Sequence, residues 1–328
     1  MTSISIRVEG VDQTGEARRA AAGLAASAGL DETAAGKLAI VVTECANNLW
    51  KHAGGGEIVL TPAGSAVEVL ALDKGPGMRN VELCFQDGYS TAGSSGTGLG
   101  AVRRLATEID IYTFPDKGTA LLARISKASR KGGAAVGGVS VPIRGESVCG
   151  DDFIFVDSPG GMKILVVDGL GHGPLAADCA SAAVEAFRES AAGGAAPELM
   201  REVHGALRAT RGAAVAIGEM DWRQGELRYC GIGNIAGIIW ENSVSRHLLS
   251  HPGIVGHDVR NVRYLTYPLG KNGLILLCSD GITTHWSLDG YPGLHLRDPA
   301  LIAGIVYRDH RRSRDDATVA VARNPDAA

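Results

Sequence analysis

The chain has 328 residues, of which 45% are hydrophobic and 21% are charged, and its formal net charge is −4. This composition is typical of a folded globular protein, and the length favours two domains. The slightly acidic balance gives no electrostatic support for nucleic-acid binding. Six scattered cysteines, with no CxxC pair or zinc-ligand spacing, predict reduced thiols. No apolar run is long enough to span a bilayer, so we expect a cytoplasmic protein without a membrane partner.

The first third of the chain alternates between strand and helix patterns. Residues 4–10 alternate like a strand, and an Ala-rich helix is expected to begin near Thr14 and end at Gly29. Asp31 is a good N-cap for a second helix, whose apolar face holds Leu38, Val41, Val42, Cys45 and Leu49. Further elements are expected in the order strand 57–62, strand 66–73, helix 98–106, strand 108–114 and strand 119–125.

Two groups of residues in this part are suited to binding a nucleotide. Glu44 and Asn48 are four residues apart on the second helix, so a carboxylate and an amide share one face near a phosphate and its metal, or form a solvated face. Asp73 ends a strand and is followed by Gly75 and Gly77. Its carboxylate can accept a hydrogen bond from an exocyclic amine such as that of adenine, or the segment is only a tight turn.

A glycine-rich loop follows, with Gly93, Gly96, Gly98 and Gly100 before a helix. Backbone N–H groups and a helix N-terminus at this point can cradle phosphates. The same composition is also found in flexible linkers. The order of the three elements, Glu-x-x-x-Asn, then Asp-x-Gly-x-Gly, then the glycine-rich loop, is more specific than any one of them.

This order resembles the N, G1 and G2 boxes of the gyrase and histidine-kinase ATP-binding superfamily, and in particular its RsbT-like serine-kinase branch. The matching segments are TECANNLWKHAGGGEIVL, DKGPGM and FQDGYSTAGSSGTGLGAVRRL, and the resemblance covers residues 1–126. It implies an α/β ATP-binding sandwich of the Bergerat type that uses ATP with magnesium. It further implies Asn48 as a metal ligand, Glu44 as general base toward a serine hydroxyl, and Asp73 on adenine. His52 is expected to be a helix-end residue rather than a phosphoacceptor.

The segment SKASRKGGAAVGGVSV is small, polar and glycine-rich, and predicts a linker, which we place at residues 127–138. Beyond it, short strand patterns alternate with Gly and Asp turns, with helices between them. This pattern of strands and helices predicts a layered sheet sandwich flanked by helices. Strands are expected at 151–157, 162–169, 213–221, 226–233, 236–240, 274–281 and 317–322, and helices at 175–191, 197–209 and 298–310.

Four aspartates lie at the ends of these strands: Asp151, Asp168, Asp280 and Asp315. Each alone could be a turn or cap residue. Carboxylates at strand ends can also meet at one edge of a sandwich, where they would bind hard divalent cations. The glycines directly after Asp168 and Asp280 strengthen the second interpretation.

The segments VDGLGHG, SDGI and DDATV resemble the metal-dependent protein phosphatase fold in its SpoIIE-type branch, with RsbX-like proteins as small relatives. The resemblance covers about residues 139–323 and implies an αββα sandwich in a domain of residues 139–328. It implies two manganese or magnesium ions held by Asp151, Asp168, Asp280, Asp315 and the carbonyl of Gly169, with a bridging water as nucleophile toward phosphoserine or phosphothreonine. Asp168 is thus both ligand and catalytic residue. Asp152 and Asp316 are the neighbours that could be confused with the true ligands.

Some basic residues depart from the family pattern or stay ambiguous. His172 stands three residues after Gly169, which argues against a general-acid role. Arg144 is expected to be a solvated surface residue rather than a phosphate ligand. The arginines before Asp315 could attract a phosphorylated partner, although a solvated helix end is the simpler interpretation, and they are Arg311, Arg312 and Arg314.

Together the two resemblances imply a bifunctional partner-switching regulator. Its first domain would phosphorylate, and its second would dephosphorylate, serine or threonine on a STAS-domain antagonist or stressosome protein. The alternative is a protein serine/threonine phosphatase whose first domain is a non-catalytic ATP-binding sensor or an anti-sigma-type binding domain.

Overall fold

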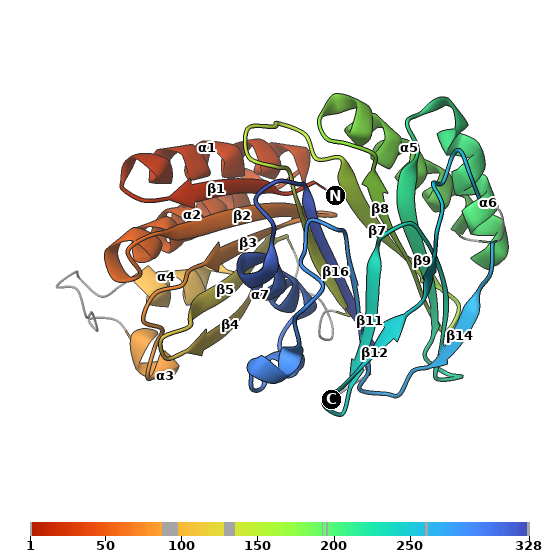
Figure 1. Cartoon of the computed structure of the whole chain (residues 1–328). Coiled ribbons are helices and arrows are strands. Elements are labelled where there is room, and N and C mark those ends of the chain that lie inside the picture. Colours follow the sequence, from red (N-terminus) through yellow and green to blue (C-terminus); the bar gives the residue numbers. More distant parts are fainter. Residues whose placement is uncertain are drawn as a thin grey trace. The chain divides into compact units, whose positions relative to one another are not determined.

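The computed structural model describes residues 2–86, 98–127, 135–191, 193–194, 196–259 and 262–326. The chain divides into two compact units, one comprising Ser3–Gly133 and the other Ala134–Ala328 together with Met1–Thr2. Figure 1 labels the elements of both units. Each unit has a hydrophobic core of its own.

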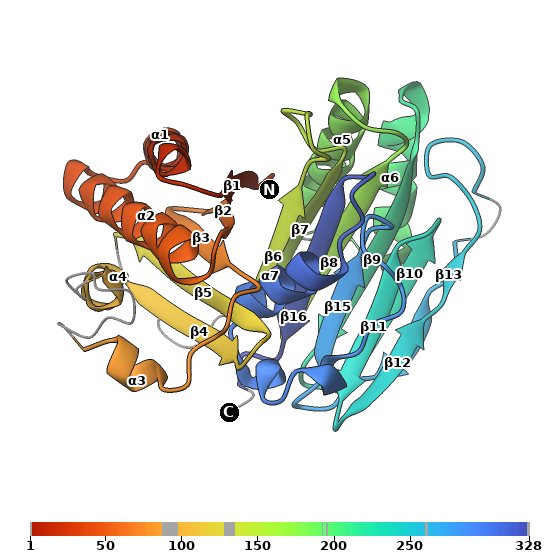
Figure 2. The ribbon, with the colours of Figure 1, turned by 60° about the vertical axis from the view of Figure 1, so that its left-hand side comes forward.

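The N-terminal unit is an antiparallel sheet with three of its helices on one face (Figure 2). The strand order is β1-β2-β3-β5-β4, and every neighbouring pair is antiparallel. Helices α1, α2 and α4 supply the side chains that pack on this sheet. The elements are β1 (Ile4–Val8), α1 (Asp12–Ser27), α2 (Glu32–His52), β2 (Gly56–Ala63), β3 (Ala66–Leu72), α3 (Val81–Cys84), α4 (Gly98–Leu105), β4 (Glu108–Phe114) and β5 (Gly118–Ser126).

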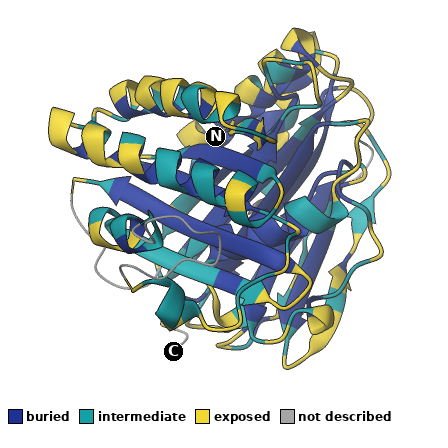
Figure 3. Cartoon of the chain, turned by 90° about the vertical axis from the view of Figure 1, so that its left-hand side faces the viewer, coloured by how far each residue is buried: buried dark blue, intermediate teal, exposed yellow. Residues whose placement is uncertain are grey.

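Helix α2 forms as its sequence predicts. Asp31 precedes it, and the Ala34 backbone N donates a hydrogen bond to Asp31 Oδ1 at 2.8 Å, which satisfies one of the open amides of the first turn. Figure 3 shows exposed residues on the outward side of α1 and α2 and a largely buried sheet. The predicted apolar face is confirmed, because all five of its residues are buried: Leu38, Val41, Val42, Cys45 and Leu49.

The C-terminal unit contains two sheets. The first has the order β13-β10-β9-β8-β7, with β14 also paired to β10, and the second has the order β12-β11-β15-β16-β6. The strands are β6 (Val136–Val141), β7 (Asp151–Ser158), β8 (Gly161–Gly169), β9 (Ala213–Asp221), β10 (Glu226–Ile232), β11 (Ala236–Glu241), β12 (Val244–Leu248), β13 (Ser250–His251), β14 (Leu265–Pro268), β15 (Leu274–Cys278) and β16 (Ala317–Arg323). The helices are α5 (Pro174–Ala191), α6 (Ala196–Ala206) and α7 (Pro299–His310), with 3₁₀ turns at Leu207–Ala209, Leu288–Gly290 and Leu294–Leu296.

Four layers make up this unit, as the sequence predicts. Side chains of both sheets meet in one core, including Phe153, Ile164 and Tyr229 from the first sheet and Ile275 and Leu277 from the second. A second core joins α5 and α6 to the other face of the first sheet. Helix α7 packs against β6 and β16 of the second sheet. The αββα sandwich is therefore confirmed.

The predicted linker at 127–138 is wrong at its C-terminal end. Val136–Val141 forms β6, which pairs with β16 inside the second sheet. The glycines here serve close packing: a Cβ at Gly138 would lie 2.7 Å from the ring of Phe153. Glycine is selected both by flexible linkers and by crowded strands, so composition alone did not separate the two.

Some short elements were not predicted, namely α3, β12, β13 and β14. Most residues of β12 are exposed, so that strand lacks the alternation of a half-buried strand. The predicted domain limits, 1–126 and 139–328, remain predictions.

Five of the six cysteines are buried, and all six are free thiols. Burial raises the pKa of Cys45 and of Cys278 to about 12, so both thiols stay protonated. This agrees with the predicted reduced thiols. No helix in the described part of the chain has the length and apolar character needed to cross a membrane.

Candidate functional site

A cavity of about 400 Å³ opens in the N-terminal unit between α2, α4 and the ends of β3 and β5. Four predicted nucleotide-binding residues line it, namely Asn48, Asp73, Gly77 and Gly98. The rest of the lining is mixed apolar and polar: Cys45, Leu49, His52, Ala53, Ala71, Pro76, Met78, Arg79, Asn80, Cys84, Leu99, Thr119 and Leu121. An apolar wall with a few convergent polar groups suits a flat, polar-edged ligand.

Glu44 and Asn48 meet the start of α4 at one side of this cavity. A Cβ at Gly98 would lie 2.7 Å from Glu44 Oε2 and 3.5 Å from Asn48 Oδ1. The Asn48 Nδ2 atom is buried and has no hydrogen-bond partner among the described residues. A buried amide without a partner is costly, so this site fits a polar ligand that would satisfy it. His52 is the last residue of α2, as predicted, and burial lowers its pKa.

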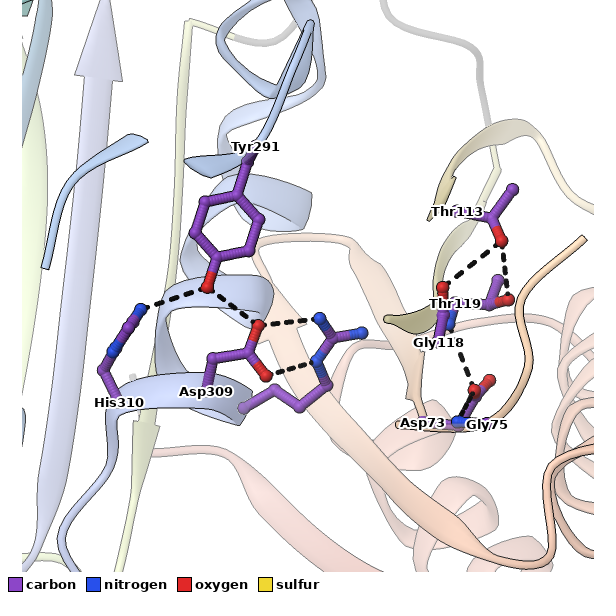
Figure 4. Close-up of polar contacts among 9 residues, drawn as sticks. Asp73, Gly75, Thr113, Gly118, Thr119, Tyr291, Asp309 and His310 are labelled. Atoms are coloured by element: carbon purple, nitrogen blue, oxygen red, sulfur yellow. Dashed lines mark hydrogen bonds and ion pairs between the residues drawn. The ribbon is translucent and has the colours of Figure 1, made fainter. Parts of the chain in front are cut away.

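Asp73 is held in place by backbone groups of two segments. Its Oδ1 accepts hydrogen bonds from Gly75 N at 2.8 Å and from Thr119 N at 3.1 Å (Figure 4). Thr113 Oγ1 joins the same network, because it donates to Gly118 O at 3.2 Å. This carboxylate is therefore oriented before any ligand arrives, which is what recognition of an amine requires.

The structure describes only some of the predicted nucleotide-binding glycines of this unit. A Cβ at Gly75 would lie 2.7 Å from that of Ala53, and Gly77 has a φ of 71°. Both positions therefore need glycine. Gly100 is buried in the first turn of α4. Gly93 and Gly96 lie outside the described residues, so the phosphate-cradling loop stays a prediction.

Thr119 and the turn before it were not predicted as part of the site. A Cβ at Gly118, where φ is 82°, would collide with the Asp73 carbonyl. The pair Gly-Thr at the start of β5 was the available signal. This pair does not by itself indicate a role in the site, because the hydrogen bond from Thr119 N to Asp73 joins residues far apart in sequence.

In the C-terminal unit, Asp151 and Asp168 face each other. Asp151 begins β7, Asp168 is near the end of β8, and the antiparallel register pairs them directly. Gly169 N donates to Gly150 O at 3.0 Å, and a Cβ at Gly169 would lie 2.6 Å from Ala176 O. The backbone thus comes close to the two carboxylates, leaving no room for a side chain at Gly169.

Asp280 and Asp315 join this pair from the second sheet. Asp280 follows β15, Asp315 precedes β16, and these two strands are neighbours. Burial, followed by the charges of Asp280 and Asp315, raises the pKa of Asp168 to about 7. Burial and then the charge of Asp168 raise the pKa of Asp151. The structure therefore brings all four predicted carboxylates to one edge of the sandwich, where they repel one another.

These residues fit hard divalent cations by their chemistry. The donor set consists of oxygens, and Asp151 Oδ2 is buried without a hydrogen-bond partner in the described part of the chain. Among the described residues, no group of three or more His, Cys, Asp or Glu side chains is arranged so that it could hold a metal ion. A cation here would therefore take part of its coordination from water and from backbone carbonyls, as Mg²⁺ commonly does.

Asp316 and Asp152, the sequence neighbours of two predicted ligands, accept backbone hydrogen bonds. Both oxygens of Asp316 accept backbone hydrogen bonds at 2.6 Å, one from Ile143 N and one from Gly150 N. Asp316 thereby ties the β6–β7 loop to the start of β16. Asp152 Oδ1 accepts from the next backbone N, that of Phe153, at 2.8 Å. Asp315 Oδ1 accepts a bond of the same kind, from Asp316 N at 3.0 Å, so these contacts set only Asp316 apart from the predicted ligands.

Several supporting residues around the carboxylates were not predicted. Asn234 Nδ2 donates to Asp280 Oδ2 at 2.6 Å. Ser279 and Thr318 lower the pKa of Asp151, although burial outweighs them. Asn234 stands in a Gly-rich turn, GIGNIAG, whose pattern indicates only a loop.

The loop that follows Asp280 contacts the C-terminal end of α7. Tyr291 Oη donates to Asp309 Oδ2 at 3.0 Å and lies 3.1 Å from His310 Nε2 (Figure 4). The His310 ring also stacks near Trp286, with centroids 5.8 Å apart. These contacts anchor the loop that follows Asp280.

The basic residues whose roles the sequence left open, His172, Arg144 and Arg312, have different surroundings. His172 Nδ1 is 2.8 Å from Glu146 Oε1 at an exposed position. Arg144 is exposed, as predicted. Arg312 is exposed, as the solvated interpretation predicts. Its charge lowers the pKa of Asp280, and its backbone N donates to Gly281 O at 2.7 Å.

Comparison with known families agrees with both sites. Residues 158–325 match the family described as Stage II sporulation protein E (SpoIIE), and residues 9–125 match the histidine kinase-like ATPase domain. The chain belongs to the SpoIIE family and carries a histidine kinase-like ATPase domain ahead of its phosphatase domain.

Two relatives from Bacillus subtilis (strain 168) each resemble one part. Serine/threonine-protein kinase RsbT is 31% identical over 91 residues, covering 26% of this chain and 68% of RsbT. Phosphoserine phosphatase RsbX is 27% identical over 139 residues, covering 42% of this chain and 69% of RsbX. The chain therefore combines an RsbT-like kinase-type domain with a serine/threonine phosphatase domain, which is a partner-switching architecture.

Solved structures support the same folds. A structure described as "The bacterial stressosome: a modular system that has been adapted to control secondary messenger signaling" has a TM-score of 0.54 and 29% identity, covering 58% of this chain and 98% of that chain. The RsbU and RsbW domains of a Mycobacterium tuberculosis protein have a TM-score of 0.50 and 20% identity, covering 59% of this chain and 61% of that chain. The second likeness concerns the fold alone.

Proposed function

We propose that this protein adds and removes a phosphoryl group on a serine or threonine of a STAS-domain partner, such as an antagonist or a stressosome component. The observation that carries the proposal is the meeting of Asp151, Asp168, Asp280 and Asp315 at one edge of a phosphatase sandwich, in the same chain as a kinase-type cavity. The relatives named for a serine/threonine kinase and a phosphoserine phosphatase support the same pair of reactions.

In the kinase-type domain, Asp73 would accept a hydrogen bond from the adenine amine, since Gly75 and Thr119 already orient its carboxylate. Asn48 would bind magnesium beside the ATP phosphates. Glu44 would accept the proton of the attacking serine hydroxyl. Magnesium, when bound, neutralises charge on the phosphates, and positioning does most of the remaining work in phosphoryl transfer.

In the phosphatase domain, the four aspartates and the Gly169 carbonyl would hold two manganese or magnesium ions. When bound, such ions supply an acidified water for attack on phosphorus. The chain's own part is orientation: Asn234 fixes Asp280 by a 2.6 Å hydrogen bond, and Asp316 fixes the loop before Asp151 through two backbone amides. Such supporting contacts tune both the geometry and the affinity of a metal site.

The test uses the full-length protein, labelled ATP, magnesium and manganese, and a purified STAS-domain protein. An Asp168→Asn variant should accumulate labelled STAS protein, because transfer continues while hydrolysis is lost. Asp152→Asn is the matched control. It makes the same Asp-to-Asn change close to the site, next to Asp151, but at a residue that is not a proposed ligand, and it should behave as the wild type. If Asp168→Asn binds ATP but labels no STAS protein, the kinase half is wrong and the first domain is a nucleotide sensor. If it still removes label at the wild-type rate, the phosphatase site is wrong.

A further inference from the structure

Arg211 lies at the same edge of the first sheet as the carboxylates. It stands two residues before Ala213, where β9 begins. β9 is the neighbour of β8, and their register places Ala214 opposite Asp168 and Ala213 opposite Gly169. An arginine far from Asp168 in sequence is therefore brought to the strand end that carries this carboxylate.

The backbone on both sides of Arg211 is constrained. Thr210 Oγ1 accepts from Gly212 N at 3.0 Å, and the Thr210 carbonyl lies 3.2 Å from His257 Nε2. On the other side, Gly212 O accepts from Leu170 N at 3.0 Å. The turn that carries Arg211 is thus tied directly to the loop after Asp168 and Gly169, so the origin of its side chain is fixed relative to that loop.

The side chain of Arg211 is exposed and is directed along this loop. A Cβ built on Gly171 would lie 3.4 Å from Arg211 Nη1. Within the described part of the chain, the guanidinium forms no hydrogen bond or ion pair. A rigid backbone thus holds an uncommitted cation beside the loop that follows two of the proposed metal ligands, Asp168 and Gly169.

Other arginines near the site are placed differently. Arg312 acts on the Asp280 carboxylate through its charge. Arg144 is exposed on the β6–β7 loop, and the side-chain atom beside Gly171 is that of Arg211. The proximity of Nη1 to Gly171 distinguishes Arg211 from both.

We propose that Arg211 is a substrate-binding residue of the phosphatase site, whose guanidinium binds the phosphoryl group of the phosphoserine or phosphothreonine. This inference rests on the proposed phosphatase function. A phosphate ester approaching four carboxylates needs cations on its free oxygens, and a guanidinium offers two parallel N–H donors that match phosphate geometry. No covalent step is assigned to Arg211.

The test compares Arg211→Gln and Arg211→Lys with Arg223→Gln in the full-length, manganese-loaded protein. Arg223 is a matched control, because it is another exposed arginine on the same sheet, beside Gly160 at the opposite end of β8. The substrate is p-nitrophenyl phosphate, which lacks any protein surface. Inorganic phosphate serves as competitive inhibitor and as the ligand in calorimetry.

Arg211→Gln should raise KM and weaken phosphate binding by about 10-fold or more, since hydrogen bonds between charged groups contribute that much. Because the contact is already made with bound substrate, kcat should change less than KM. Arg211→Lys should retain part of the affinity, and Arg223→Gln should match the wild type. Circular dichroism checks that each variant is folded.

Wild-type KM and phosphate affinity in Arg211→Gln would overturn the inference, as would a loss confined to a phosphoprotein substrate, which indicates docking instead. It is also overturned if Arg144→Gln or Arg312→Gln alone weakens phosphate binding. If the wild-type protein hydrolyses no phosphate ester, the proposed function fails. Calorimetry with inorganic phosphate still decides the role of Arg211 in that case.

Discussion

The two sites of this protein differ in how far the chain itself completes them. In the N-terminal cavity, Asp73 already has two backbone donors, and the surrounding wall is largely apolar. At the C-terminal edge, Asp151 and Asp168 face each other across a strand pair, and charge and burial raise the pKa of both. The first site combines an oriented Asp73 with an Asn48 amide that has no partner among the described residues, whereas the second concentrates like charges.

This difference concerns the ligand as well as the protein. Asp73 is already oriented in the N-terminal cavity, so a ligand that binds it would need no rearrangement of this carboxylate. The C-terminal edge needs cations to offset the repulsion, because clustered carboxylates destabilise the fold that holds them. Stability and metal binding should therefore be linked in the C-terminal unit and not in the N-terminal one.

The largest expected effect is on phosphoryl transfer. Glu44→Gln should lower transfer to a STAS-domain protein by a factor on the order of 10²–10⁴, because a general base is lost while the side chain keeps its size. ATP affinity and phosphatase activity should remain. Glu16→Gln, an exposed change on α1, is the control for the loss of one charge. Transfer measured with labelled ATP in the Asp168→Asn background decides the outcome, and unchanged transfer would exclude Glu44 as the base.

The corresponding change in the other domain is Asp168→Asn. Hydrolysis of p-nitrophenyl phosphate should fall by more than about 100-fold, since even supporting residues of metal sites contribute 10- to 100-fold. Without added metal, the variant should be no less stable than the wild type, because one repelling charge is gone. Steady-state rates and thermal unfolding test the two statements. A strongly destabilised variant would mean that Asp168 is mainly structural.

Metal binding should stabilise one unit only. Manganese at 100 times its dissociation constant should raise the free energy of unfolding of the C-terminal unit by about 2.7 kcal/mol. The N-terminal unit should not respond to manganese unless nucleotide is present. Thermal unfolding with and without chelator, compared between wild type and Asp168→Asn, measures this. Equal manganese stabilisation of both proteins would contradict the proposed ligand set.

A smaller effect is expected from the support of Asp280. Asn234→Ala removes the 2.6 Å hydrogen bond to its carboxylate and should weaken metal affinity or activity by about 10- to 100-fold. Asn234→Asp should be worse, because it places another negative charge beside Asp280. Manganese titration of the phosphatase activity separates affinity from turnover. An alanine variant with wild-type metal affinity and rate would show that the bond is dispensable.

The smallest effect concerns the boundary between the domains. We expect residues 1–126 and a C-terminal fragment each to fold alone and to keep their ligands. A fragment that begins at residue 134 retains all of β6, while one that begins at 139 lacks the part paired with Ala320, Val321 and Ala322. The shorter fragment should be less stable by about 1–2 kcal/mol, from lost strand hydrogen bonds. Urea unfolding of the two fragments makes the comparison, and equal midpoints would show that residues 136–138 add no stability to the domain.

Local pattern was enough to predict much of this protein. The helix after Asp31 follows from its cap and from the spacing of its apolar residues, and both are properties of neighbouring positions. The strand-end aspartates were equally visible, because each ends or begins an apolar run next to a turn. The short motifs that contain them resemble those of metal-dependent phosphatases, and that resemblance is also a property of neighbouring positions.

Only the tertiary structure decided which residues support or complete the sites. Thr119 meets Asp73, Asn234 meets Asp280, and the turn of Arg211 reaches the loop after Asp168 through contacts between segments distant in sequence. The sequence by itself determined the elements, the motifs and the class of chemistry, since these depend on short-range spacing. The roles of supporting residues, and the use of the β6 glycines for packing, depend on strand register and on close approach between layers, which no local pattern records.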